Sequence, residues 1–456
     1  MQVPHHVFKA YDIRGLSKGE ITQAFAYALG KAYVTFLTKE NPGVDLRVVV
    51  GHDMRETSPV LEEFLIKGLT ECGADVFQVG LVSTPAYYFS VGHLEAQGGL
   101  MVTASHNPAQ YNGFKVVRAK AVPLGGESGF EQMRDIMEQE TFLVTEKQGI
   151  VTQIEAIPEK AAEAEITYAG DALIKKFKII VDSGNGMGAQ YLDALFEKIN
   201  VDVTRMYWDM DGTFPNHESN PMKEETLIEM KKRLIEEQAD LGIATDGDGD
   251  RIFFIDNTGK TVEPAIIRGM LAQVMLRRFP GSTICYDVRP GKITKDLIEE
   301  AGGKPSLTKV GHSLIKAQMR EVGAMFGGES SGHFFYRYPT GIYEGPVTAI
   351  IQILQELTAS GKTFSELTAP YYRYFHSGEI NYVVEDKEAT LARIRVAYAD
   401  ADLMELDGLT VTYPTYWFNV RPSNTESLLR FTLEAVDQAT MEQQRDEVIH
   451  LIQSAS

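Results

Sequence analysis

The chain has 456 residues, of which 44% are apolar and 23% charged, as expected for a globular protein of about two to four domains. Its 63 acidic residues outnumber its 44 basic ones, and a net charge of −19 argues against a nucleic-acid partner. The chain has only two cysteines, no apolar run of about eighteen residues and no cationic start before an apolar core, so we expect a cytoplasmic protein without membrane contact.

Short apolar runs rich in β-branched residues alternate with helical patterns through the first three quarters of the chain. Three of these runs predict buried strands, at 46–50, 178–181 and 283–286. Apolar residues at helical spacing predict helices at 61–70, 227–237 and 293–300. This alternation is typical of α/β layers built on mixed, mostly parallel sheets.

The pattern recurs three times along the chain. Each predicted strand leads into a polar loop, and a second apolar run follows some tens of residues later and also ends in a polar loop. The second loops lie at 103–108, 246–251 and 327–333. We interpret the recurrence as three copies of one α/β unit.

The last quarter has a different pattern. Strands of an antiparallel layer are predicted at 379–384, 409–413 and 428–433, with helices at 389–399 and 441–454. A separate α+β domain is therefore expected, and the predicted domains are 1–150, 151–254, 255–368 and 369–456. The acidic, alanine-rich segment 155–165 predicts a solvated helix.

In the first copy, the second polar loop reads Thr103-Ala104-Ser105-His106-Asn107-Pro108. It follows the apolar run 98–102. A serine at the end of a buried strand is well placed for chemistry, and Pro108 keeps the segment from continuing as a helix. The glycine spacing of a hydrolase nucleophile elbow is missing. By itself the stretch is also consistent with a polar turn that carries a helix-capping serine.

The next polar loop reads Asp246-Gly247-Asp248-Gly249-Asp250-Arg251. Three carboxylates at alternate positions can converge on one point if the glycines supply backbone freedom, and such oxygen ligands suit Mg²⁺ or Ca²⁺. An EF-hand is excluded because an apolar strand resumes at 252–255, where that loop would need its last ligand. We therefore expect a divalent cation here, with an acidic solvent turn as the alternative.

Two further loops suit a phosphorylated sugar. Glu329, Ser331 and His333 in the loop 327–333 offer donors and acceptors for sugar hydroxyls. The segment 421–426 combines an arginine with hydroxyls and backbone amides, as anion-binding turns do. Taken alone, each of these loops is better explained as an ordinary polar turn.

Two short segments in the first domain carry basic residues. Arg14 lies in 8–15 beside an aromatic residue, and Lys115 belongs to what we interpret as an Asn-Gly turn at 111–115. Neither segment is specific by itself.

In this order, the loops resemble the α-D-phosphohexomutase superfamily, specifically the bacterial phosphomannomutase/phosphoglucomutase group. The matching segments are 9–15, 103–108 with 111–115, 246–251, 327–333 and 421–426. The resemblance implies four domains around a central cleft, of which three are the α/β copies and the fourth binds phosphate. It also implies that Ser105 carries a phosphoryl group and gives it to a hexose monophosphate. The other phosphate of the bisphosphorylated intermediate then returns to the serine, so that 1-phospho and 6-phospho sugars interconvert.

The resemblance implies roles for individual residues as well. Mg²⁺ would be held by Asp246, Asp248, Asp250 and the phosphorylated Ser105, which would neutralise the charge of the phosphate. The implied catalytic residues are Ser105, Lys115, Arg14, His312 and His333. The implied substrate-binding residues are Tyr11, Arg251, Arg289, Glu329, Ser331, Arg421, Ser423, Asn424 and Thr425. The only expected partner is a phosphosugar, and the expected assembly is a monomer or a weak homodimer.

Three positions depart from the pattern of the group and leave the sugar open. Ser330 stands where methionine is usual, Ser427 where proline is usual, and Arg289 where the dual-specificity members have lysine. Mannose and glucose phosphates are the expected substrates, and a phosphoglucosamine mutase is the alternative enzyme. A phosphosugar-binding protein without turnover and a phosphatase are the alternatives from other classes.

Overall fold

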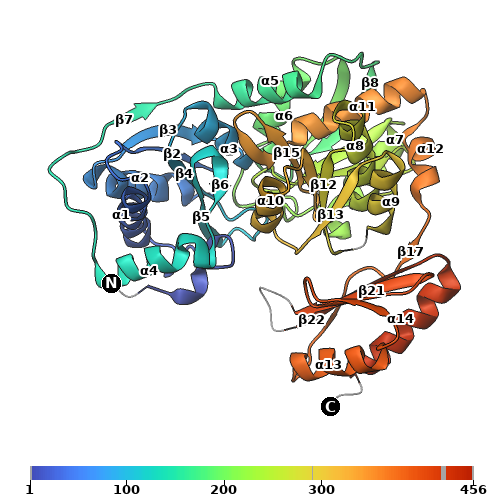
Figure 1. Cartoon of the computed structure of the whole chain (residues 1–456). Coiled ribbons are helices and arrows are strands. Elements are labelled where there is room, and N and C mark those ends of the chain that lie inside the picture. Colours follow the sequence, from blue (N-terminus) through green and yellow to red (C-terminus); the bar gives the residue numbers. More distant parts are fainter. Residues whose placement is uncertain (1–2, 290, 423–427, 454–456) are drawn as a thin grey trace. The chain divides into compact units, whose positions relative to one another are not determined.

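The computed structural model describes residues 3–289, 291–422 and 428–453, apart from the side chain of residue 127. Figure 1 shows the helices and strands along the chain. The chain divides into two compact units. Unit 1 comprises 1–262 with 331–365, and unit 2 comprises 263–330 with 366–456. No described helix combines the length and the apolar character that a membrane span requires.

The first sheet mixes parallel and antiparallel strands in the order β1-β5-β4-β2-β3-β7, with β6 beside β5. Its strands are β1 (Ile13–Leu16), β2 (Arg47–His52), β3 (Asp75–Leu81), β4 (Gly98–Val102), β5 (Tyr111–Arg118), β6 (Val122–Pro123) and β7 (Val151–Gln153). Its helices are α1 (Gln23–Glu40), α2 (Ser58–Glu71), α3 (Thr84–His93) and α4 (Glu131–Gln139). β2 pairs in parallel with β3 and β4, whereas β4 and β1 pair antiparallel with β5.

The second sheet repeats this arrangement in the order β11-β10-β8-β9. Its strands are β8 (Phe177–Asp182), β9 (Val201–Met206), β10 (Leu241–Thr245) and β11 (Ile252–Asp256). Its helices are α5 (Ile157–Ala169), α6 (Gly188–Phe196) and α7 (Ile228–Glu236). β8 pairs in parallel with β9 and β10, and β10 pairs antiparallel with β11.

A third copy centres on β12, which pairs in parallel with β13 and β14. The strands of this part of the chain are β12 (Thr283–Asp287), β13 (Lys304–Thr308), β14 (Phe326–Gly328), β15 (Phe334–Tyr338) and β16 (Gly341–Glu344), of which the last two form an antiparallel pair. The helices are α8 (Pro264–Arg278), α9 (Lys292–Glu300), α10 (His312–Glu321), α11 (Pro346–Ser360) and α12 (Phe364–Thr368). The shared pairing of β2, β8 and β12 confirms the threefold recurrence, and β4, β10 and β14 lead into the three polar loops.

The last sheet is antiparallel, with the order β17-β22-β21-β20-β19 and β18 beside β22. Its strands are β17 (Phe375–His376), β18 (Ile380–Tyr382), β19 (Asp402–Met404), β20 (Leu409–Thr412), β21 (Tyr416–Pro422) and β22 (Leu429–Ala435). Helices α13 (Lys387–Ala397) and α14 (Gln438–Gln453) contribute Ile394 and Val448 to the same buried core as Phe418 and Phe431 of the sheet. This is the predicted α+β domain.

Two sequence interpretations were wrong in detail. Asn112 and Gly113 form no hairpin turn, because both lie inside β5 and pair with β1. A side chain at Gly113 would collide with the backbone of Ile13, so close strand packing explains this glycine better than turn chemistry does. The acidic segment at 155–165 does form most of α5, but Glu165 is buried rather than solvated.

Candidate active site

Ser105 lies three residues beyond the end of β4 and is 2% exposed. Its backbone has φ 51°, a left-handed conformation that is uncommon for a residue with a side chain. The Ser105 amide donates to Thr103 Oγ1 over 2.9 Å, and the hydroxyl donates to Asp246 Oδ2 over 3.2 Å. The serine of the first domain therefore points at the acidic loop of the second.

The acidic loop joins β10 to β11 and is almost closed to solvent. Asp246, Asp248 and Asp250 are at most 1% exposed, and one carboxylate oxygen of each lies within 4.8 Å of the others. Gly249 has φ 74°, and a Cβ on Gly247 would lie 2.5 Å from the Ser105 carbonyl oxygen. The glycines of this loop thus allow both its curvature and its close contact with the serine loop, the segment 103–110 between β4 and β5.

Two of the carboxylates pair with a buried lysine. Lys115 Nζ lies 2.5 Å from Asp250 Oδ2 and 3.0 Å from Asp248 Oδ2. Burial alone would lower the pKa of Lys115, but the charges of Asp248 and Asp250 raise it well above its usual range. Burial, together with the neighbouring charges of Asp250 and Asp248, raises the pKa of Asp246 to about 7.

The donor set fits a divalent cation. Lys115 pairs with only two of the three carboxylates, and the buried Asp248 Oδ1 has no hydrogen-bond partner among the described residues. Buried anionic oxygen without a partner is costly, and a hard cation would satisfy it. The loop is therefore a metal-binding acidic cluster.

Further predicted residues surround this cluster within unit 1. His333 Nε2 lies 3.1 Å from Asp250 Oδ1, and its Nδ1 lies 2.9 Å from Ser331 Oγ. Arg251 Nε lies 3.6 Å from Asp246 Oδ2 and 3.4 Å from His333 Nε2. Ser331, His333 and Arg251 are thus brought to the same place as the metal cluster.

The N-terminal segment also contacts the loop that carries Ser105. Arg14 Nη1 donates to Asn107 Oδ1 over 2.7 Å, and Arg14 Nη2 pairs with Asp12 Oδ2 at 2.5 Å. Tyr11 is half-buried, two residues before β1. The structure thus brings the predicted Arg14 to the Ser105 loop.

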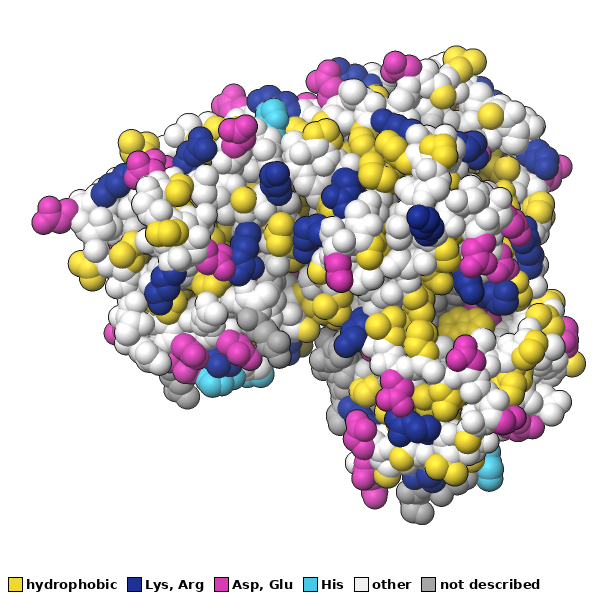
Figure 2. All heavy atoms as spheres, viewed as in Figure 1, with side chains coloured by type: hydrophobic (Ala, Val, Ile, Leu, Met, Phe, Trp, Pro, Cys, Tyr) yellow, Lys and Arg dark blue, Asp and Glu magenta, His cyan; other side chains and the backbone are white. Residues whose placement is uncertain are grey.

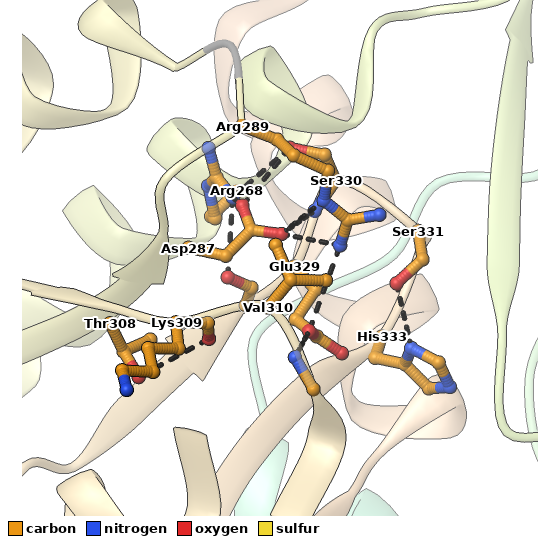
Figure 3. A network of polar contacts seen from close by, with 12 residues as sticks. Arg268, Asp287, Arg289, Thr308, Lys309, Val310, Glu329, Ser330, Ser331 and His333 are labelled. Atoms are coloured by element: carbon orange, nitrogen blue, oxygen red, sulfur yellow. Dashed lines mark hydrogen bonds and ion pairs between the residues drawn. The ribbon is translucent and has the colours of Figure 1, made fainter. Parts of the chain in front are cut away.

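In unit 2, Arg289 and Glu329 belong to one polar network (Figure 3). Arg289 Nε donates to Asp287 Oδ2 over 2.6 Å, and its Nη2 lies 3.6 Å from Glu329 Oε1. The same Glu329 oxygen accepts from the Gly311 amide over 2.8 Å, immediately before the buried His312. Three predicted residues of this unit therefore lie close together.

Arg421 lies in β21 rather than in the turn that the sequence suggested, and it is 4% exposed. Its Nη2 donates to Glu379 Oε2 over 2.6 Å. Burial and the positive charge of Arg289 lower the pKa of Arg421. The predicted Ser423, Asn424 and Thr425 lie outside the described residues.

The sequence analysis missed several residues of these polar networks, including the following four. Thr84 Oγ1 donates to Asp248 Oδ2 over 2.7 Å. Glu344 is buried and brings a carboxylate oxygen within 4.8 Å of ligand atoms of Asp250 and His333. The other two are Arg55, described below, and Arg268, whose Nη1 donates to Asp287 Oδ1 over 2.8 Å.

One of these four residues, Arg55, could have been predicted from the threefold recurrence in the sequence. Asp53-Met54-Arg55 comes immediately after the central strand β2, and Asp287-Val288-Arg289 begins at the last residue of the central strand β12. In both places the aspartate forms an ion pair with the arginine two residues later. A strict alignment of the copies would therefore have singled out Arg55 alongside Arg289.

Family models match almost the whole chain. Domains I, II and III of phosphoglucomutase/phosphomannomutase, each described as alpha/beta/alpha, match residues 5–143, 159–259 and 264–374. The C-terminal domain of the same family matches residues 379–451.

Individual relatives agree over their full lengths. The "Phosphohexose mutases" protein of Xanthomonas campestris pv. campestris is 37% identical, with 98% of both chains covered. The "Phosphomannomutase/phosphoglucomutase" of Pseudomonas putida is 36% identical, with 97% of this chain and 95% of that one covered. A crystal structure of a phosphoglucomutase/phosphomannomutase family protein from Burkholderia thailandensis has a TM-score of 0.90 at 29% identity, covering 100% of this chain and 98% of that one. The chain therefore belongs to the phosphoglucomutase/phosphomannomutase family and is a phosphohexomutase.

Proposed function

We propose that Ser105 stores the phosphoryl group that this phosphohexomutase transfers. The observation that carries the proposal is the Ser105 hydroxyl, which is buried and lies 3.2 Å from Asp246 within a cluster of three buried carboxylates. The phosphorus–oxygen bond to Ser105 would break as a hexose monophosphate hydroxyl attacks and loses its proton. In the second half of the reaction, the other phosphate of the bisphosphate would return to Ser105.

The proposed cofactor is Mg²⁺, held by Asp246, Asp248 and Asp250 together with the phosphorylated Ser105. Bound there, the cation would neutralise phosphate charge, as divalent metals do in phosphoryl transfer. The three aspartates suit Mg²⁺ because they are hard oxygen donors on one glycine-containing loop.

Five basic residues are proposed to stabilise charge or move the substrate proton. Lys115 is buried beside the acidic loop, and Arg14 is held at Asn107 of the serine loop. Arg251 and His333 stand beside Asp246 and Asp250. His312 is proposed to act in unit 2, where it begins α10.

Substrate binding is proposed for residues of both units. Glu329 and Ser331 would bind sugar hydroxyls, and Tyr11, Arg251 and Arg289 would contact the phosphosugar. Arg421 with Ser423, Asn424 and Thr425 would hold the phosphate that is not being transferred. Arg421 supports an anion site here because its guanidinium is buried in β21, immediately before this loop.

Mannose and glucose phosphates are the proposed substrates, because relatives that match over the whole chain are named for them. Glucosamine phosphate remains the alternative sugar. We also propose a cytoplasmic monomer or weak homodimer without nucleic-acid or membrane partners, with domains at 1–150, 151–254, 255–368 and 369–456.

The test combines mass spectrometry with turnover. Enzyme quenched during the reaction should carry phosphate on Ser105, and catalytic efficiencies should rank mannose 1-phosphate or glucose 1-phosphate above glucosamine 1-phosphate. A phosphate found on another residue would refute the role of Ser105. Release of free phosphate in place of the isomer would refute the phosphoserine mutase cycle, and a preference for glucosamine would correct the sugar.

A further inference from the structure

Arg55 lies three residues beyond the end of β2 and is 1% exposed, although it carries a full positive charge. Its guanidinium donates to four backbone carbonyl oxygens of the segment that carries Ser105. Nη2 donates over 2.9 Å to Ser105 O and over 2.6 Å to Asn107 O, and Nη1 donates over 2.9 Å to Pro108 O and over 3.0 Å to Tyr111 O. One buried side chain thus gathers the serine loop along its length.

The guanidinium is itself fixed from several sides. Arg55 Nε lies 3.2 Å from Asp53 Oδ2, which supplies its buried counter-charge. The other oxygen, Asp53 Oδ1, accepts from the Arg55 amide over 3.0 Å and from Ser58 Oγ over 2.6 Å. The guanidinium carbon lies 5.1 Å from the centre of the Phe214 ring, which belongs to the second domain of the same unit.

The loop that Arg55 holds needs external support. Ser105 has a left-handed φ of 51°, which costs free energy for a residue with a side chain and persists only where surrounding contacts impose it. The Ser105 carbonyl is held by Arg55, and Gly247 of the acidic loop packs against the same oxygen. The position of the hydroxyl relative to Asp246 therefore depends on how firmly this carbonyl is held.

We infer that Arg55 is a positioning residue for phosphoryl transfer: it fixes the strained serine loop so that Ser105 Oγ stays aimed at the acidic cluster. The inference rests on the proposed role of Ser105 as phosphate carrier. Arginine suits this task because its planar guanidinium offers five donors in a rigid fork, whereas lysine concentrates its charge on one rotating ammonium. A lysine at this position would keep the charge beside Asp53 and lose most of the carbonyl contacts.

The test uses Arg55→Lys in the full-length enzyme loaded with Mg²⁺. Misplacing a reacting group by about 1 Å costs on the order of a hundredfold in rate, so we expect kcat to fall by roughly that factor. The KM for the hexose phosphate should stay within about threefold, because the described contacts of the Arg55 guanidinium are with Asp53, Phe214 and backbone carbonyls rather than with any proposed substrate-binding side chain. Hydrogen exchange should speed up in the segment 103–111 more than in the rest of the first sheet.

The matched control is Arg118→Lys. Arg118 belongs to the same domain, donates to the carbonyl of Ser128 and stacks on Phe36, but it does not touch the serine loop. Its kcat should stay within about twofold of the parent. If Arg55→Lys does not fold, Asp53→Asn removes the counter-charge with less loss of packing, and it should lower kcat by about tenfold with KM unchanged.

The outcomes separate the two proposals. A parent enzyme without phosphate on Ser105 during turnover would overturn the proposed function. A parent phosphorylated on Ser105, together with a folded Arg55→Lys enzyme at parental kcat, would overturn the inference alone. An equal loss of kcat in Arg55→Lys and Arg118→Lys would also overturn it, because general destabilisation would then explain both.

Discussion

Ser105 has the backbone strain that accompanies many functional residues. A left-handed conformation at a residue other than glycine costs about 1–3 kcal/mol and needs support from neighbouring contacts. Here the support comes from Thr103 Oγ1 at the amide and from Arg55 at the carbonyl. In this conformation the Ser105 hydroxyl lies at the contact between two domains of unit 1, where it meets Asp246.

At the level of single residues, Ser105→Ala should lower kcat by at least about a hundredfold, because the enzyme then loses the group proposed to carry the phosphate. Steady-state turnover with glucose 1-phosphate and mannose 1-phosphate measures the loss. The control is Ser90→Ala, which removes another buried hydroxyl of the first domain, one that donates only to the Tyr87 carbonyl. A Ser105→Ala enzyme with a near-parental rate would contradict the proposal.

Among the elements, the acidic loop between β10 and β11 couples cation binding to pH. Burial and neighbouring charges raise the pKa of Asp246 to about 7, so its carboxyl is protonated at pH 6 when no cation is bound. A cation must displace that proton, and its affinity therefore falls as the pH drops below about 7.

Saturable stabilisation by Mg²⁺ should consequently be larger at pH 8 than at pH 6. Thermal unfolding at fixed, sub-saturating Mg²⁺ measures this difference as a shift in Tm. Asp246→Asn should show little shift at either pH, whereas Asp193→Asn, which changes an aspartate paired with Arg205, should behave as the parent does. Equal Mg²⁺ shifts at both pH values in the parent would argue against Asp246 as a ligand.

A second pH effect belongs to the buried carboxyl group of Glu165, which lies at the N-terminus of helix α11. Glu165 Oε2 accepts from the Thr348 amide in the first turn of this helix over 2.8 Å, and Glu165 also pairs with the Tyr191 hydroxyl. A carboxylate at a helix N-terminus is favourable, yet burial outweighs these contacts and raises the pKa of Glu165 from 4.5 to about 7. The folded state therefore binds the Glu165 proton more tightly than the unfolded state does.

The sign of the pH effect follows directly. Glu165 contributes most to stability below about pH 4.5, and this contribution is lost as the pH rises towards 7, by up to roughly 3 kcal/mol. Glu165→Gln cannot ionise, so its Tm should decline less than that of the parent between pH 5 and 7.5. Glu163→Gln on the exposed side of α5 serves as the control. Parallel Tm curves for parent and Glu165→Gln would contradict the assignment.

Considered as a whole, the molecule is acidic but mixes charges on its surface. On the face shown in Figure 2, basic and acidic side chains of the described residues are interspersed. Basic side chains are instead grouped locally, as where Arg251 Nε lies 3.4 Å from His333 Nε2 in unit 1. An anionic substrate can be held by such a cluster although the net charge is −19.

The two compact units predict how the whole chain unfolds. The acidic cluster belongs entirely to unit 1, so Mg²⁺ should stabilise the unfolding transition of that unit and leave the transition of unit 2 in place. At about a hundredfold over Kd, the gain is roughly 2.7 kcal/mol, or about 4 °C for a unit of this size. Differential scanning calorimetry should resolve the shift, and an equal displacement of every transition would contradict this division.

The sequence by itself determined the classes of structure and the acidic loop. Strand period, helical spacing and the recurrence of a strand followed by a polar loop are local patterns, and they predicted three α/β copies and an antiparallel last domain. The acidic loop 246–250 was predicted as a cation site in the same local way, because alternate carboxylates with intervening glycines are seldom found for other reasons. The matches to the family models and to a solved structure confirmed the predicted fold class and the membership of the phosphohexomutase family.

Only the tertiary structure decided which distant residues meet. Arg55 precedes the serine it supports by 50 residues, and Lys115 precedes Asp250 by 135. The interpretation of Asn112-Gly113 as a turn failed for the same reason, because pairing with β1 overrode the local preference for a hairpin. Local sequence encodes backbone preference and chemical type. Burial, counter-charges and shifted pKa values arise from groups that only the folded chain brings together.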